Sequence, residues 1–561
     1  MHNLPVRVYH RQWYTTLAEA TLSEPATWGR DLLLTPSSIR HIKCDETRPA
    51  CTRCTSTRRR CDGYLPPSVT MPRRRLADLV RQIPSLAPAS ETLMPILRQF
   101  PGASISELDM QFFDVFRHTT APGTASLLPS SFWTCDLLRM AHGESAIWHA
   151  TLSLGALHHQ WEADRMSRLR GEVPSGKFRR EALMHYFRAI SLAQAIADNP
   201  TLRALSVVLV AVSNILGRWS DSRTHLFGGL QLLDRDHDGG SDVDSTAEML
   251  ERLDLQAMTF SDSQAPYPFE SPVWLRSLHR RLHGTTSIES YGQAGTLIFA
   301  LLRQFILTSV HGPEERSTPK TPGPFQNGLI GDLEAWEAKM LAFEAATPRH
   351  GIPALSICLY HAQLRLWIAA SFEGDESRWD TDECLFYFDY IVSLAEALLR
   401  KLKMQSVNPL SLEPAVIVPL FSTAHRCRHP HLRRKALNLL KTCKRQEGMW
   451  SSDGAAAVVE RIIVAEEGPE KLSREHRETE VPAEFNQGDA PDVPWDAWSS
   501  KPRSLPRNVS WEGLDITPKS RRVKDVLVIV NAEERKVAIT MLFPNALDPQ
   551  AIKAIDDVLH F

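Results

Sequence analysis

A compact cluster of four cysteines contains the residues with the clearest capacity for chemistry. The cluster consists of Cys44, Cys51, Cys54 and Cys61, in the pattern C-x6-C-x2-C-x6-C. Zinc favours tetrahedral coordination by thiolates, and a two-residue spacer lets Cys51 and Cys54 turn back onto one ion. Nine cysteines in 561 residues are too few for a disulfide scaffold. Crowding four of them into 18 residues therefore predicts a metal site in a reducing compartment.

The cysteines lie within a basic island. Residues 40–75 contain ten Lys or Arg against three Asp or Glu, a net charge of +7, whereas the whole chain carries −2. Nearby arginines favour the thiolate form of a cysteine, which is the form that binds zinc. A basic island in an otherwise acidic chain is typical of a nucleic-acid contact. The local charge therefore predicts DNA or RNA as a partner, which the whole-chain charge does not.

The cysteine segment resembles a known DNA-binding module. Residues 39–46, Pro49-x-Cys51-x-x-Cys54 and residues 61–64 are similar to the fungal binuclear zinc-cluster domain. That family uses six cysteines, C-x2-C-x6-C-x5–12-C-x2-C-x6–8-C, to hold two zinc ions. The resemblance implies that Arg40 and His41 face the base edges of a CGG triplet in the major groove, where an Arg can bind guanine N7 and O6 together. It implies that Lys43 supports contacts to phosphates and bases.

A second basic group extends this interpretation. It comprises the triplets Arg58, Arg59, Arg60 and Arg73, Arg74, Arg75. These arginines could contact DNA phosphates or form a nuclear import signal, and the alternative is a solvated basic face. We predict the first triplet as part of the DNA-binding surface.

The sequence departs from the family pattern at its first two cysteines. Those positions hold Leu34 and Ser37, and no cysteine precedes Cys44. Structural zinc supplies roughly 10–16 kcal/mol of folding energy in small modules, so the loss of ligands is decisive. We therefore expect the chain as written to bind a binuclear cluster poorly. Two explanations stay open, a misassembled N-terminus or a degenerate relative, and a single four-thiolate zinc site is conceivable.

The rest of the chain has mainly helical periodicity. We predict a mainly α fold with a large all-helical regulatory domain over 105–467, a small zinc-cluster remnant over 40–64 and a β-hairpin over 526–542. Residues 1–39 are unassigned, 65–104 form a Pro-rich basic linker, and 468–561 form a loose tail that contains the hairpin. The expected core stripes are Ile147, Ala150, Leu154, Leu157, Trp161; Leu183, Phe187, Ile190, Ala197; and Leu432, Ala436, Leu439, Cys443.

Short motifs within this helical region carry a second resemblance. Residues 112–116, 131–133 and 146–158 are similar to the opening of the fungal-specific transcription-factor domain. The runs Cys427-Arg428-His429-Pro430 and Glu447-Gly448-Met449-Trp450 are similar to its closing section. The resemblance implies an all-helical domain that regulates the DNA-binding module, often with dimerisation or an effector response. Residues 207–216 are apolar but too short to span a membrane, which predicts a buried helix.

Other motifs favour structural roles. Asp234-x-Asp236-x-Asp238-Gly239 begins like a calcium-binding loop, but Ser245 stands where that loop needs a bidentate Glu. A solvated acidic loop is the better interpretation. Four histidines near one helix, His142, His149, His158 and His159, are expected to be ordinary packed or surface residues. No catalytic motif stands in the required context, so we predict that the protein is not an enzyme.

These patterns predict a nuclear, zinc-dependent and sequence-specific regulator of RNA polymerase II transcription. Its expected partners are double-stranded DNA with CGG-like sites, the transcription machinery and a second copy of the chain, with no membrane contact. The alternative is a helical regulatory protein that does not bind DNA because its zinc cluster is degenerate.

Overall fold

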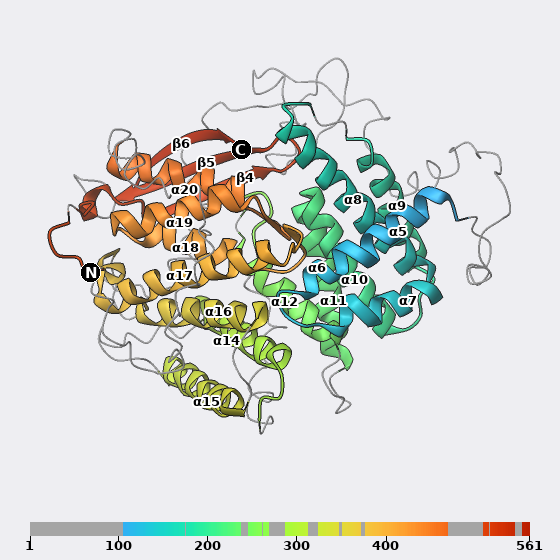
Figure 1. The fold of residues 1–561 in the computed structure, drawn as a ribbon, viewed down its shortest axis with the longest axis horizontal. Helices are drawn as coiled ribbons and strands as arrows, with labels where there is room; N and C mark the ends of the chain where they lie inside the picture. The colour runs from blue at the N-terminus through green and yellow to red at the C-terminus, as the bar shows by residue number, and fades with distance from the viewer. Residues whose placement is uncertain are drawn as a thin grey trace, which may run out of the picture. The chain divides into compact units, whose positions relative to one another are not determined.

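A computed structural model describes most of the helical region and the C-terminus. The described residues are 105–173, 176–236, 245–260, 262–268, 287–311, 324–346, 351–371, 376–468, 509–514, 516–544 and 552–561. The predictions for residues 1–39, 40–64 and 65–104 lie outside these ranges. Figure 1 shows helices over most of the described chain and a sheet formed by its last segments. The predicted mainly α fold is confirmed.

The first half of the body is built from helices that pack around α8 and α10 (Figure 1). Short π-helical turns, η2 and η3, interrupt the chain near its start. The elements are α5 (Glu107–Val115), η2 (Phe116–Thr120), α6 (Ala121–Ala125), η3 (Phe132–Asp136), α7 (Leu137–Gly143), α8 (Ser145–Leu169), α9 (Arg179–Ala193), α10 (Asn199–Leu216), α11 (Trp219–Asp236) and α12 (Ser245–Thr259).

The second half continues the helical body and ends in strands. Helix α12 of the first half packs against α14 of the second, so the halves share one core. The elements are α14 (Tyr291–His311), α15 (Pro324–Ala346), α16 (Ile352–Ala369), η6 (Glu376–Asp380), α17 (Asp382–Met404), β1 (Leu410–Ser411), α18 (Ile417–Arg426), α19 (Pro430–Cys443), β2 (Gln446–Glu447), β3 (Trp450–Ser451), α20 (Ser452–Glu467), η7 (Lys519–Arg521), β4 (Asp525–Asn531), β5 (Lys536–Pro544) and β6 (Ile552–His560).

Local sequence signals set the helix ends. Ser106 and Asp109 form a capping box at the start of α5. Pro430 stands at the first position of α19, where its missing N–H costs nothing. Ser451 caps α20 by accepting a hydrogen bond from an amide three residues on. The helix stops before Gly468.

The core stripes agree with the prediction in two helices of three. In α8 the aliphatic members of the stripe are buried, and in α19 Leu432 and Ala436 are. In α9 the predicted stripe is wrong by one residue. The buried residues are Ala182, Tyr186 and Ala189. The Ser153 hydroxyl of α8 donates to the carbonyl of Ala182 at 2.8 Å, and such a close approach requires small side chains.

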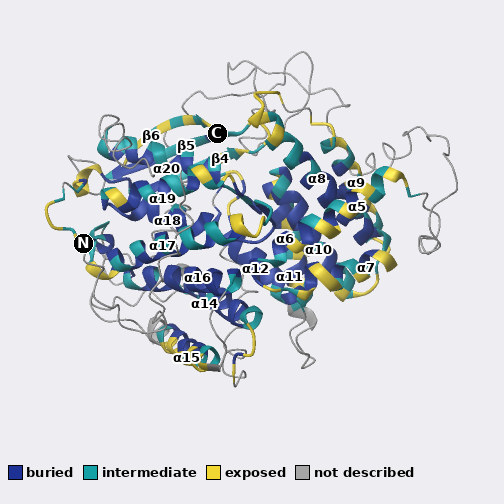
Figure 2. Cartoon of the chain, viewed as in Figure 1, coloured by how far each residue is buried: buried dark blue, intermediate teal, exposed yellow. Residues whose placement is uncertain are grey.

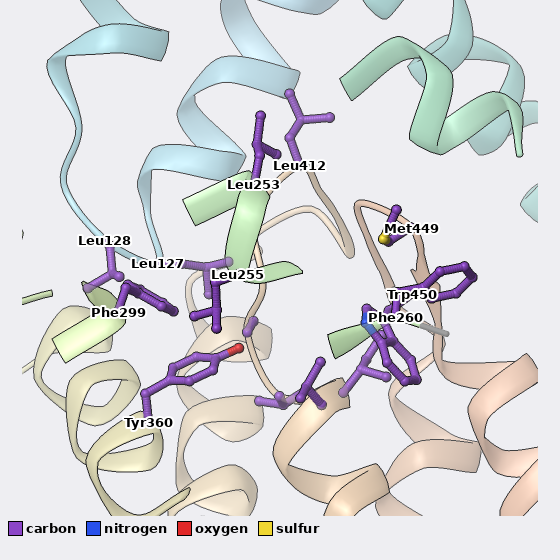
Figure 3. Packing of buried hydrophobic residues seen from close by; sticks show 14 of the residues in the cluster. Leu127, Leu128, Leu253, Leu255, Phe260, Phe299, Tyr360, Leu412, Met449 and Trp450 are labelled. Atoms are coloured by element: carbon purple, nitrogen blue, oxygen red, sulfur yellow. The ribbon is translucent and has the colours of Figure 1, made fainter. Parts of the chain in front are cut away.

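Helix α10 is the most apolar helix of the first half and lies in the core (Figure 2). By length and composition it could cross a membrane, and 67% of the window concerned is buried within the protein. A core helix passes the same test. The prediction of a buried helix over 207–216 agrees with this burial. The core continues through α12, α14 and α16, where Leu255, Phe299 and Tyr360 lie together (Figure 3).

The last strands form an antiparallel sheet in the order β4-β5-β6. The hairpin is confirmed, with Val526 opposite Met541 and Asn531 opposite Lys536. The third strand, β6, was not predicted. Alternate residues of the sheet, including Val537 and Ile539, form a buried cluster with Val458 and Ile462 of α20. Residues 516–544 and 552–561 therefore pack on the helical body and do not form a loose tail.

Candidate functional site

The residues predicted to bind zinc and DNA lie outside the described part of the chain. They are Cys44, Cys51, Cys54, Cys61, Arg40, His41, Lys43, Arg58, Arg59 and Arg60. Their roles remain predictions. Among the residues that the structure describes, no group of three or more His, Cys, Asp or Glu side chains could hold a metal ion. The donor set near the N-terminus offers four thiolates, which suffice for one tetrahedral zinc but not for the six-thiolate binuclear cluster.

The weaker sequence motifs belong to the structure of the body. Asp234 and Asp236 continue helix α11, so the predicted acidic loop is wrong at these two positions. The His158 ring nitrogen Nδ1 lies 2.8 Å from the Thr120 hydroxyl, and burial lowers the pKa of His158 to about 4. His149 stacks on His185 within the same helical layer. These histidines pack between helices and do not converge on one point.

The described residues enclose a cavity of about 540 Å³ beneath the C-terminal sheet. Its lining comes from β4 on one side and from helices α8, α10, α14, α16, α18 and α20 on the other. Val526, Val528 and Val530 point to one face of β4 because alternate residues of a strand share a face, and all three line the cavity. The volume lies in the usual range for small-molecule sites, roughly 300–1,000 Å³.

Aromatic side chains dominate this cavity. They come from elements far apart in sequence and are Trp161, Trp219, Phe260, Phe305, Trp367, Trp379, Phe421, Trp450 and Phe561. Phe260, Met449 and Trp450 lie close together (Figure 3), with the rings of Phe260 and Trp450 meeting edge to face at 5.5 Å. Rings in this arrangement give a stiff apolar wall.

Three buried nitrogens of the lining residues have no hydrogen-bond partner among the described residues. They are the indole Nε1 atoms of Trp379 and Trp450 and the Nε2 atom of His425. Buried polar atoms in native proteins are nearly always paired, so each of these nitrogens calls for an explanation. By contrast, Trp219 Nε1 in the same lining donates to the Val530 carbonyl at 3.1 Å.

Two titratable groups of the cavity favour their neutral forms. Burial raises the pKa of Asp525 to about 7, although Arg426 and the Val526 amide work in the opposite direction. Burial lowers the pKa of His425 well below its ordinary value, and the neighbouring guanidinium groups of Arg426, Arg428 and Arg433 lower it further. His425 is therefore uncharged at neutral pH.

The edge of the sheet is fastened to the helical body. The Val528 carbonyl accepts a hydrogen bond from the Ser263 amide at 2.8 Å, and the Val530 amide donates to the Asp262 carboxylate at 2.7 Å. The hairpin turn rests on Gly217, whose φ is 71° and where an added Cβ would lie 2.6 Å from Ala532 Cβ. The Arg179–Glu533 ion pair joins the turn to α9 at 3.5 Å. These contacts hold the sheet over the cavity.

A buried network of arginines and glutamates lies beside the cavity. Arg428 and Arg433 both pair with Glu466, at 2.9 and 2.7 Å, and all three side chains are fully buried. Arg433 and Arg434 pair with Glu467. Glu466 also accepts a hydrogen bond from the Val523 amide, directly before β4. Residues 427–430 and 432–434 thus connect α19 and α20 to the sheet.

The run Glu447-Gly448-Met449-Trp450 also has a structural explanation. The carboxylate of Glu447 accepts hydrogen bonds from the amides of Ala415, Val416 and Ile417, which begin α18. A negative charge at a helix N-terminus is stabilising. Gly448 has φ 54°, and a Cβ there would meet the Gln256 side chain at 2.2 Å. Both residues therefore position the cavity wall formed by Met449 and Trp450.

Comparisons with known proteins show which families the chain is similar to. Residues 38–69 match the family model of the fungal Zn(2)-Cys(6) binuclear cluster domain. The match begins directly after Ser37, where the second family cysteine would stand. The predicted resemblance to fungal zinc-cluster transcription regulators is therefore confirmed.

Two curated regulators share sequence with the chain. The aspercryptin biosynthesis cluster-specific transcription regulator atnN of Emericella nidulans is 26% identical over 217 residues, which are 35% of this chain and 33% of the relative. The transcription regulator lscL of Purpureocillium lilacinum is 24% identical over 214 residues, 36% of this chain and 48% of the relative. The chain thus spans a third to a half of these relatives. No solved structure matches it significantly.

Sequence reasoning missed the cavity and its polar atoms. The lining residues are spread from position 157 to 561, and no local pattern brings them together. A weak signal existed in the number of tryptophans, since 14 of 561 residues is a high content.

Proposed function

We propose that the protein is a sequence-specific, DNA-binding regulator of RNA polymerase II transcription that acts in the nucleus. The observation that carries the proposal is the match of residues 38–69 to the zinc-cluster family, together with relatives that are transcription regulators. The basic module would bind DNA, and the helical body would control its output. We include a homodimer and contacts with the transcription machinery in the proposal, and we assign the chain no catalytic step.

The proposed DNA contact rests on the chemistry of three residues. Arg40 can bind guanine N7 and O6 through two parallel hydrogen bonds, which is worth about 1–3 kcal/mol of discrimination against another base. His41 and Lys43 would add contacts to the same triplet and its phosphates. Arg58, Arg59 and Arg60 would neutralise phosphates, so binding should weaken steeply as salt rises.

Zinc would hold this module together through Cys44, Cys51, Cys54 and Cys61. Four thiolates satisfy one ion, and the family cluster with two ions needs two more cysteines than residues 40–64 contain. The zinc content of the full chain therefore separates the two forms. Two ions per chain would show ligands beyond these cysteines, and one ion would indicate a four-thiolate site.

The test combines metal analysis with a DNA shift on the full chain. Purified protein should contain zinc by mass spectrometry of the metal and retard a CGG duplex but not a scrambled one. Cys54→Ser should lose both properties, whereas Cys135→Ser, which changes an exposed cysteine of the body, should keep them. Arg40→Ala should weaken binding at least tenfold, and the exposed Arg139→Ala should not.

A second candidate function is supported by the missing cysteines. With Leu34 and Ser37 in the ligand positions, the cluster would be vestigial, and the helical body would act through protein partners or an effector. A folded chain without bound zinc and without preference for CGG would favour this function. It would also overturn the first proposal.

A further inference from the structure

The cavity beneath the C-terminal sheet has the physical properties of a ligand site. Its volume is about 540 Å³, and its aromatic walls come from both the helical body and the chain's last residue, Phe561. Val528 and Val530 are only half-buried on the face of β4 that lines it. A well-packed core would bury such valines fully, so this volume is more than a packing fault between layers.

The polar atoms of the lining indicate what the ligand must carry. The indole N–H groups of Trp379 and Trp450 can only donate hydrogen bonds. An unmade hydrogen bond at a buried donor costs roughly 1–3 kcal/mol. A ligand oxygen that accepts from these groups would recover that cost, because carbonyl and hydroxyl oxygens are good acceptors. His425 Nε2 adds a third position that can donate or accept, depending on its tautomer.

The charges around the cavity argue against an ionic ligand. Arg179 and Arg535, which line the cavity, are paired with Glu533 and Asp453. The third lining cation, Arg168, is exposed to solvent and is balanced by the nearby carboxylates of Asp164 and Asp453. Arg426, beneath the floor, pairs with Glu376. His425 is neutral for the reason given above, and burial favours the neutral form of Asp525. A buried ion would therefore lose its water without gaining a partner.

We propose that this cavity binds an uncharged, largely apolar small molecule that contains a ring system and at least one carbonyl or hydroxyl oxygen. The rings lie between the aromatic walls and the valines of β4. The oxygen accepts from the indole N–H of Trp379 or Trp450 once that ring has turned, since both nitrogens are shielded from contact in the free protein. The ligand contacts the helices and the sheet together, so its binding stabilises the docked sheet.

The proposal is tested with two fluorescent probes on the full chain without DNA. Prodan is an uncharged naphthalene with one carbonyl oxygen, and N-phenyl-1-naphthylamine is an uncharged probe that lacks a carbonyl. Both should bind with saturation and a blue-shifted emission. Val528→Trp fills the cavity and should weaken both probes at least tenfold. Ile529→Trp, on the exposed opposite face of the same strand, should change neither.

The indole donors are tested separately from the cavity volume. A double variant, Trp379→Phe with Trp450→Phe, keeps one aromatic ring at each position and removes both N–H groups together with the pyrrole rings, so the probe without a carbonyl reports the effect of the lost volume. It should weaken prodan about fivefold or more and leave N-phenyl-1-naphthylamine unchanged. Trp511→Phe is the matched control, because it removes an unpaired indole N–H outside the cavity.

Two results would overturn the proposal. One is the absence of saturable binding of either probe to the wild-type chain. The other is equal binding to the Val528→Trp and Ile529→Trp variants, which would place the probes elsewhere. Because DNA is absent, neither result depends on the function proposed for residues 40–64.

Discussion

The arginine–glutamate network and the cavity are neighbours beneath the same sheet, and they differ in how their buried side chains are paired. In the network, each of Arg428, Arg433 and Arg434 has a carboxylate partner within 3 Å, although Arg428 Nε has no hydrogen-bond partner among the described residues. In the cavity, Trp379, Trp450 and His425 each leave a buried nitrogen unpaired among the described residues. Paired groups fix the packing of α19, α20 and the sheet. The unpaired nitrogens belong to residues that line an empty volume, so they can still gain a hydrogen-bond partner.

This difference in pairing gives a way to separate buried polar groups that stabilise the fold from those that bind a ligand. A protein loses stability when one partner of a buried ion pair is removed, because the other charge then stays buried without a partner. A donor without a partner has little to lose when it is removed. Stability measurements on the two regions should therefore differ strongly, although their residues are equally buried.

The largest effect is expected for Glu466→Ala. This change leaves Arg428 and Arg433 without their shared carboxylate and removes the acceptor for the Val523 amide. We expect a loss of about 3–5 kcal/mol in the free energy of unfolding, measured by urea denaturation. Glu460→Ala is the control. Glu460 lies on α20, as Glu466 does, and its ion pair with Lys441 of α19 is more exposed. If Glu466→Ala lowered the free energy of unfolding by less than about 1 kcal/mol, the network and the cavity would not differ as described.

Asp525 should make stability depend on pH. Burial raises its pKa from 3.8 to about 7, so the folded state binds a proton that the unfolded state releases between these values. Stability from this group is therefore highest below pH 4 and declines as pH rises to about 7, by up to about 4 kcal/mol. Asp525→Asn should abolish this decline.

The measurement compares unfolding free energies of wild type and Asp525→Asn between pH 5 and 8. Histidines with lowered pKa values, such as His158, contribute to both proteins and cancel in the difference. The variant should gain stability relative to wild type as pH rises. A pH-independent difference would show that the carboxyl group is ionised throughout.

Gly217→Ala should loosen the contact between the sheet and the helices. The left-handed conformation of Gly217 disfavours a side chain, and the new Cβ would collide with Ala532. We expect a cost of about 2–3 kcal/mol by thermal unfolding. Gly171→Ala isolates the backbone cost, since Gly171 has the same φ of 71° and open space around it. Equal losses of unfolding free energy for Gly217→Ala and Gly171→Ala would mean that the hairpin turn does not pack on Gly217.

The smallest effect is expected for Trp450→Phe. Its indole nitrogen has no partner among the described residues, so the variant loses only the packing of the larger ring. Trp219→Phe loses the same part of the ring and also a hydrogen bond to the Val530 carbonyl in the same cavity lining, so it should cost about 1 kcal/mol more than Trp450→Phe. Equal losses in chemical denaturation would mean that Trp450 is paired in solution.

The sequence by itself determined the helical class, the hairpin and the resemblance to zinc-cluster regulators. These features depend on local signals: the spacing of apolar residues, caps such as Pro430, and cysteine spacing. Strand β6 was missed because Asp556 and Asp557 in its middle are poor strand formers. The α9 stripe was misplaced because close packing on α8 favours Ala182 and Ala189 over larger residues nearby.

Only the tertiary structure decided which buried polar groups are paired. Arg428 meets Glu466 across 38 residues, and β4 meets helices that precede it by more than 200. Such contacts depend on how the layers close, which hydrophobic periodicity does not encode. The cavity follows from the same closure, because the sheet rests on α20 and on the hairpin turn and leaves volume between them. The cysteines carry the resemblance to the zinc-cluster family, and the packing locates the ligand site we propose.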